Sequence, residues 1–186
     1  TAYHEAGHAI VAKLVPGADP VHKVTIIPRG RALGLTMQLP EEERSAHDRT
    51  WLTNTLCTLL GGRVAEEIVF QQMTTGAGND IERVSDIARR MVCEWGMSEV
   101  IGPLTFRAPQ PLGGQPGQIL SEATATVIDA EVKKLVQSAA DTAGQLLSDN
   151  RPALEALTSA LLERETLNRD DIRQIVDRAR PQTTAA

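Results

Sequence analysis

The chain opens with TAYHEAGH, residues Thr1–His8, and this stretch decides how the rest of the sequence is interpreted. His4 and His8 are four residues apart, so on an α-helix both imidazoles lie on one face, one turn apart. Two neutral imidazoles at this spacing can bind one Zn²⁺ ion, and Glu5 beside them is then placed to act as a general base in the H-E-x-x-H pattern. The alternative is an amphipathic helix with two incidental histidines, because short motifs also match by chance.

Composition limits the class of protein. The 186 residues suit one domain, or one domain with a helical extension. The net charge of −5 argues against nucleic acid as the main partner. Cys57 and Cys93 are too few for a thiolate zinc site, and we expect them to be buried helix residues in a reducing compartment. The sequence shows no apolar run long enough to span a membrane and no signal peptide.

Two short apolar stretches after the first helix predict a β-hairpin. Residues 21–27 are apolar on both faces, and residues 33–39 alternate between apolar and small or polar side chains, as in a half-buried strand. The segment Arg29–Arg31 is expected to form the turn. An edge strand of such a hairpin could pair with an extended peptide. From the pattern alone, a hairpin that merely covers the core is the somewhat better interpretation.

A long helix is predicted from a capping-box-like start at Ser45 and Asp48 to about Phe70, after the charge run at 41–44. Gly61-Gly62 inside it lowers helix stability by about 1 kcal/mol per glycine, which indicates close packing against another helix. Glu66 follows one turn later and is expected to lie near this contact between the two helices. The alternative is that Glu66 and Glu67 are both solvated.

The next helix carries a carboxylate on an unusual face. After the loop 73–78, Asn79 is expected to cap the helix together with Glu82. Asp80 lies on the same stripe as the apolar residues Val84, Ile87 and Met91, so it faces the core, where an unpaired carboxylate is unfavourable. A metal ion would compensate for its burial. The alternative is that Asp80 only interacts with the helix dipole, which explains its position along the helix but not its face.

The remainder is interpreted as packing or assembly helices without chemistry. We divide the single domain into a zinc-site core with the hairpin (1–107), a Pro- and Gly-rich loop (108–118), a helical C-terminal part (119–180) and a tail (181–186). The C-terminal helices are expected to begin at about Ser121, at Asn150 and at an Asn168/Asp171 cap.

Further stretches follow the opening motif in order along nearly the whole chain: VTIIPRGRALG at 24–34, LGGRVAEEI at 60–68, TTGAGND at 74–80, GMS at 96–98, GPL at 102–104 and LLERETL at 161–167. H-E-x-x-H alone indicates only a broad class of zinc peptidases. The ordered set resembles the C-terminal peptidase domain of FtsH-type membrane-anchored AAA+ zinc metalloproteases. The loop at 109–117 is shorter than is usual in that family.

The resemblance implies a mainly α domain with a small β-hairpin or sheet near the active site. It implies that His4, His8 and Asp80 bind one Zn²⁺, with Glu5 as the catalytic base, and that Glu66 supports a histidine from close by. It also implies that the strand bearing the substrate-binding residues borders the cleft; these are Val24, Thr25, Ile26 and Ile27.

The function expected from the resemblance is endopeptidase cleavage of unfolded membrane and cytosolic proteins in quality control. His4 lies so near the first residue that we expect a fragment of a longer protein. The longer protein would carry an AAA+ motor with ATP and Mg²⁺, a membrane anchor and a homo-oligomeric, hexameric ring, with this domain on the cytoplasmic side (matrix or stroma side in an organelle) and soluble by itself. The alternatives are a catalytically silent, zinc-stabilised assembly module and a free-standing zinc peptidase of another family.

Overall fold

The computed structural model describes residues 1–28, 34–39, 46–106 and 120–179. The predicted turn at 29–31, the charge run at 41–44, Ser45, the loop at 108–118 and the tail at 181–186 lie outside the described residues. The elements, in order, are α1 (Ala2–Leu14), β1 (Val21–Thr25), β2 (Leu35–Gln38), α2 (Arg49–Phe70), the 3₁₀ turn η1 (Thr75–Ala77), α3 (Gly78–Cys93), α4 (Glu122–Asp149), α5 (Arg151–Arg164), β3 (Thr166–Asn168) and α6 (Arg169–Ala179).

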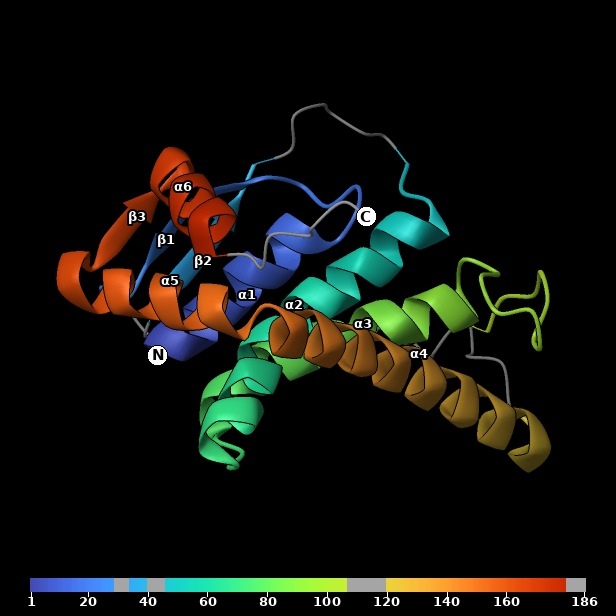
Figure 1. Cartoon of the computed structure of the whole chain (residues 1–186). Helices are drawn as coiled ribbons and strands as arrows, with labels where there is room; N and C mark the ends of the chain where they lie inside the picture. The colour runs from blue at the N-terminus through green and yellow to red at the C-terminus, as the bar shows by residue number, and fades with distance from the viewer. Residues whose placement is uncertain (29–33, 40–45, 107–119, 180–186) are drawn as a thin grey trace, which may run out of the picture.

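Helix α1 lies at the centre of the fold, as Figure 1 shows, and packs against α2, α4, α5 and the sheet. Its small apolar side chains allow neighbouring elements to approach closely, and Ala6, Ala9 and Ile10 are completely buried. Leu154, Leu157 and Leu161 of α5 belong to the same hydrophobic core, whereas Leu162 of that helix is exposed. The C-terminal helices therefore complete the core around α1. The expected mainly α fold with a small sheet is confirmed.

The crossing of α1 and α2 depends on glycine. A Cβ atom at Gly7 would lie 2.4 Å from the Gly61 carbonyl oxygen and 2.6 Å from Ala65 Cβ. A Cβ atom at Gly61 would lie 2.8 Å from the Gly7 carbonyl oxygen. All three contacts are too short for real atoms, so the two backbones touch where no side chain intervenes. This confirms the close helix packing predicted from the glycine pair in α2.

Two predicted helix starts are corrected. Helix α2 begins at Arg49, and its N-cap is Asp48, whose carboxylate accepts a hydrogen bond from the Trp51 backbone N–H at 2.7 Å. Helix α3 begins at Gly78 after the N-cap Ala77, so Asn79 is inside the helix rather than its cap. The preceding turn η1 replaces a side-chain cap, and Thr74 begins that turn by accepting from the Gly76 N–H.

The C-terminal helix starts agree with the sequence. Ser121 accepts a hydrogen bond from the Thr124 N–H at the start of α4. Asn150 is the N-cap residue of α5. Asn168 and Asp171 each accept from the backbone N–H of the other, which is the reciprocal capping pattern expected at α6.

The sheet has three antiparallel strands in the order β2-β1-β3. The short strand β3 was not anticipated from the sequence, and it makes β1 the central strand. The apolar residues of β2 alternate as predicted, but Leu35 and Met37 are exposed while Thr36 is half-buried toward α1. The sheet packs against α1 through β1 and β2 and against α6 through β1 and β3.

Cys57 and Cys93 are both buried and free, as expected. Burial raises the pKa of each thiol above its usual value. Among the described residues, no helix is both long enough and apolar enough to cross a membrane.

Candidate metal centre and active site

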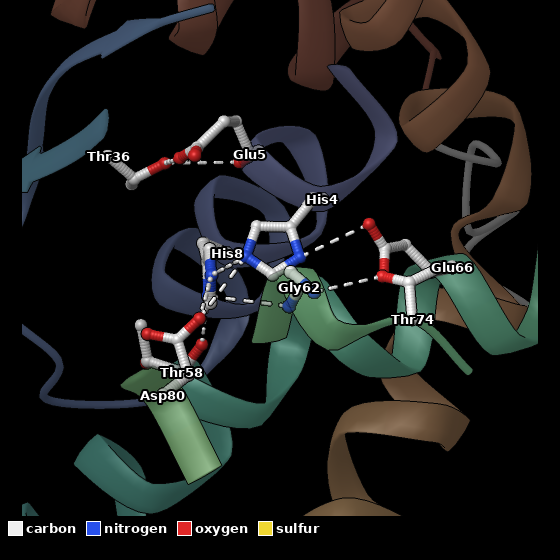
Figure 2. Close-up of polar contacts among 10 residues, drawn as sticks. His4, Glu5, His8, Thr36, Thr58, Gly62, Glu66, Thr74 and Asp80 are labelled. Atoms are coloured by element: carbon white, nitrogen blue, oxygen red, sulfur yellow. Dashed lines mark hydrogen bonds and ion pairs between the residues drawn. The ribbon is translucent and has the colours of Figure 1, made fainter. Parts of the chain in front are cut away.

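His4 and His8 project from the same face of α1, as their spacing predicts (Figure 2). Their Nε2 atoms are 3.0 Å apart, and the two rings meet edge to face at an interplanar angle of 85°. Both rings lie against α2, and His8 is buried. The start of α1 therefore brings the Nε2 atoms of His4 and His8 close together.

The protonation of His8 follows from its partner on α2. His8 Nδ1 is 2.7 Å from the Thr58 backbone carbonyl oxygen, which can only accept a hydrogen bond. The Gly62 N–H also lies near Nδ1, but at 3.3 Å that contact is the longer of the two. We therefore assign the proton to Nδ1, and in the neutral ring Nε2 keeps its lone pair. A histidine that donates its second ring N–H to a backbone carbonyl is the usual arrangement of a metal ligand, because the hydrogen bond fixes both tautomer and ring orientation.

Asp80, in the first turn of α3, reaches the same point. Its Oδ2 atom is 3.2 Å from His4 Nε2 and 3.2 Å from His8 Nε2. The three donor atoms could together hold a metal ion. Donors bound to tetrahedral zinc at about 2.0–2.1 Å are separated by about 3.3 Å, so the triangle fits zinc with little adjustment. Val84 and Met91 on the same stripe of α3 are buried, which confirms that this stripe faces the core.

The three groups perturb one another electrostatically. Burial alone would raise the pKa of Asp80, but hydrogen bonds from His4 and His8 hold it well below its usual range. Burial alone would lower the pKa of His8, but the Asp80 carboxylate raises it above its usual value. Asp80 is therefore ionised, which is the form that a metal requires.

Glu66 of α2 lies on the other side of His4 (Figure 2). Its Oε1 atom is 3.5 Å from His4 Nδ1, a buried nitrogen that has no hydrogen-bond partner among the described residues. Its Oε2 atom accepts a hydrogen bond from Thr74 Oγ1 at 3.1 Å. Glu66 is buried and Glu67 is exposed, so the interpretation that both are solvated is wrong. Thr74 opens the TTGAGND stretch that carries part of the family resemblance, but nothing in the sequence indicated its contact with Glu66.

Glycine makes room for the histidine rings. A Cβ atom at Gly62 would lie 2.6 Å from His8 Nε2 and 2.7 Å from His4 Cε1. Sequence analysis assigned the glycine pair of α2 to helix packing alone. The structure divides it: Gly61 permits the helix crossing, whereas Gly62 faces the candidate metal centre.

Glu5 is buried but turned away from the donor triangle, toward β2 (Figure 2). Thr36 Oγ1 donates a hydrogen bond to Glu5 Oε2 at 2.7 Å. Glu5 therefore lies beside the histidines without being one of the three converging donors, as the motif predicts. The sequence did not single out Thr36, because a threonine in an alternating strand is ordinary.

The structure limits how residues 24–27 can meet a substrate. Val24 and Thr25 lie in the central strand, are buried, and pair with β2 on one side and β3 on the other. The Ile26 N–H donates to the Glu165 carbonyl oxygen, while the Ile27 side chain is 45% exposed. A peptide therefore cannot pair with the backbone of Val24 and Thr25. Within the described residues, the strand beside Glu5 with a free outer side is β2.

An H-E-x-x-H helix whose two histidines meet a carboxylate from a second helix defines the class of zinc metallopeptidases. The comparisons agree: the model of peptidase family M41 matches residues 1–175. The chain therefore belongs to peptidase family M41.

Named relatives are similar over nearly the whole chain. "ATP-dependent zinc metalloprotease FtsH" of Acidobacterium capsulatum is 55% identical over 182 residues, which cover 95% of this chain and 28% of the relative. "ATP-dependent zinc metalloprotease FtsH 4" of Sorangium cellulosum is 56% identical over 183 residues, with the same two shares. A Magnetococcus marinus relative with the first of these names is 53% identical and covers 92% of this chain. The chain thus spans little more than a quarter of the length of these relatives.

Proposed function

We propose that this chain is the proteolytic domain of a zinc-dependent endopeptidase in which His4, His8 and Asp80 bind the metal. The observation that carries the proposal is the donor triangle, with separations of 3.0, 3.2 and 3.2 Å. The His8 proton is assigned to Nδ1, the ring nitrogen that faces away from the donor triangle. Zinc bound there supplies a Lewis acid that polarises the substrate carbonyl and lowers the pKa of a water molecule.

The other residues of the site have separate roles in this proposal. Glu5 accepts a proton from the attacking water and passes it to the leaving amine. Glu66 orients His4 through Nδ1, as a carboxylate commonly does for a metal-bound histidine. An unfolded substrate lies extended along the free side of β2, by the usual mode of strand addition, and the exposed Ile27 side chain lines the cleft beside it.

The names of the relatives extend the proposal to the longer protein. They include ATP dependence, which we assign to an AAA+ motor domain that binds ATP and Mg²⁺ outside these 186 residues. We further propose a membrane-anchored hexamer with this domain on the cytoplasmic side, or on the matrix or stroma side in an organelle. Its role would be quality control of unfolded membrane and cytosolic proteins, without a nucleic-acid partner.

Glu5→Gln tests the proposal directly. The variant should retain zinc, because none of the three donor atoms is changed, and should lose cleavage of casein, because the base is gone. Glu67→Gln, an exposed carboxylate on α2, is the matched control and should cut casein normally. Zinc content by elemental analysis and casein digestion separate the outcomes. Full activity of Glu5→Gln would contradict the mechanism, and a zinc-loaded wild type that never cuts casein would support a silent assembly module.

A further inference from the structure

The Glu5 carboxylate is held by the strand on which a substrate would lie. Thr36 Oγ1 is 2.7 Å from Glu5 Oε2 and 3.2 Å from the Glu5 carbonyl oxygen. A hydroxyl has one proton to donate, and the shorter bond to the carboxylate is the stronger because its acceptor is charged. Only 6% of Glu5 is exposed, so little water competes for this contact.

Gly34 completes the contact from the residue before β2. A Cβ atom there would lie 2.5 Å from Glu5 Oε1, 2.7 Å from Cγ and 2.9 Å from Cδ. The backbone of Gly34 is not in the left-handed region, so another residue could adopt its conformation. A side chain at this position would therefore displace the Glu5 carboxylate from the place that it occupies.

Both contacts restrict a side chain that is otherwise flexible. Glu5 has three side-chain torsions, and a carboxylate anchored at neither oxygen would sample several rotamers. Thr36 binds one oxygen, and the surface of Gly34 bounds the other. A general base works only within hydrogen-bonding reach of the proton that it takes, and a misplacement of 1 Å can lower a rate about 100-fold.

We propose that Thr36 and Gly34 are positioning residues that hold the Glu5 carboxylate, so that the strand receiving the substrate also sets the place of the base. The inference rests on the proposed role of Glu5. Side chains alternate along a strand, so Thr36 points toward α1 while Leu35 and Met37 point away from it and are exposed. A peptide added to the free side of β2 would take its register from the same strand that anchors Glu5.

Thr36→Val removes the hydroxyl and keeps the shape of the side chain. In the zinc-loaded chain with an unstructured peptide substrate, we expect kcat to fall about 10–100-fold while KM changes less than about twofold. Thr36→Ser should restore most of kcat because it keeps the donor. Thr55→Val is the control, since Thr55 is also half-buried and its hydroxyl bonds only the Trp51 carbonyl oxygen on α2.

Two measurements do not depend on activity. Zinc affinity, measured by competition with a chelator, should be unchanged in Thr36→Val. The reason is that Thr36 contacts none of the three metal-binding atoms of His4, His8 and Asp80. A double-mutant cycle with Glu5→Ala should show coupling between Thr36 and Glu5 in the denaturation midpoint of the metal-free protein. Thr55→Val should show no coupling with Glu5→Ala. If Thr36→Val does not fold, Thr36→Ala and Gly34→Ala replace it, and each should lower kcat without changing zinc affinity.

The outcomes distinguish this inference from the proposed function. If Glu5→Gln is inactive and Thr36→Val keeps the kcat of the wild type, the positioning role is overturned and the base assignment stands. Zero coupling in the double-mutant cycle would also overturn it. If Glu5→Gln is fully active, the proposed function itself fails, whatever Thr36→Val does.

Discussion

At the scale of single residues, the position of one proton prepares the metal centre. The Thr58 carbonyl oxygen accepts a hydrogen bond from His8 Nδ1–H, and Nε2 of the same ring faces Asp80. The alternative tautomer would place a proton on Nε2 and a lone pair against a carbonyl oxygen, which is repulsive. The backbone of α2 therefore selects the form of His8 that a metal can bind, before any metal arrives.

The Asp80–His8 pair predicts how the stability of the metal-free protein depends on pH. The lowered pKa of Asp80 contributes stability above its unfolded value of 3.8, and this is lost as the pH falls. The raised pKa of His8 contributes stability below its unfolded value of 6.5, and this is lost as the pH rises through the folded value. In the presence of a chelator, the unfolding free energy of the wild type should exceed that of Asp80→Asn most clearly between pH 3.8 and pH 6.5. A difference that is constant from pH 3 to pH 9 would contradict the prediction.

Removing single carboxylates should separate ligands from supporting residues. Asp80→Ala should lower zinc affinity by more than ~100-fold, because a donor atom is lost. Glu66→Ala should lower it by about 10–100-fold, because the proposed role of Glu66 is to orient His4 from 3.5 Å away. Glu67→Ala and Asp86→Ala, exposed neighbours on the same two helices, are the controls and should leave the affinity unchanged. Competition with a zinc-binding dye measures all four. A larger loss in Glu66→Ala than in Asp80→Ala would show that the third ligand is misassigned.

At the scale of elements, α2 contacts the candidate site over about two of its turns, from Thr58 to Glu66. Thr58, Gly62 and Glu66 are four residues apart, so all three lie on the face that meets the histidines. The carbonyl oxygen of the first fixes His8, the second leaves space for both rings, and the third reaches His4. The H-E-x-x-H helix alone would leave each histidine free to rotate.

Gly62→Ala tests this arrangement. Its Cβ atom would overlap His8 Nε2 and His4 Cε1, so the rings must move and zinc affinity should fall by at least 10-fold. Gly144→Ala on α4 is the matched control, because the nearest atom to a Cβ there is Val64 Cγ1 at 3.7 Å, an ordinary contact. The control should bind zinc normally and gain about 0.5–1 kcal/mol of stability. Equal zinc affinity in the two variants would show that Gly62 does not shape the site.

At the scale of the whole molecule, the proposed cleft accepts only an extended chain. A folded domain must be unfolded before its chain can lie extended in the proposed cleft, and unfolding a domain requires about 5–15 kcal/mol. The sequence contains no G-x-x-x-x-G-K-[ST] phosphate-binding loop that could couple ATP to this work. The substrate range of these 186 residues should therefore depend on substrate stability and not on ATP.

Digestion by the zinc-loaded chain tests this limit. Casein should be cut at the same rate with and without ATP, and a stable folded domain should remain intact in both conditions. The same domain, unfolded by a destabilising substitution, is the control and should be cut. ATP-stimulated digestion of the folded domain by this chain alone would contradict the assignment of the motor to a region outside it.

The sequence by itself determined the helices to within a few residues of their ends and the residue types of the candidate site, but not strand β3. The periodicity of apolar residues and the capping residues predicted the helices. The i, i+4 spacing predicted that His4 and His8 lie together. The stripe shared with Val84 and Met91 indicated that Asp80 faces inward. These features are local, since each depends on residues within a few turns of one helix. The family resemblance added the roles of Asp80 and Glu66, and it placed the substrate along residues 24–27.

Only the tertiary structure decided which groups from distant segments meet. Strand β3 pairs with β1 across more than 140 residues, so no local pattern could show that Val24 and Thr25 lie in the central strand. The contacts of Thr58, Thr74, Thr36 and Gly34 also join different elements. A hydroxyl or a carbonyl has no sequence signature for its partner, because its hydrogen bond depends on distance and direction after the helices have packed. The packing of α1 against α2 and β2 therefore decides how the site is held, while the local sequence decides which chemistry it contains.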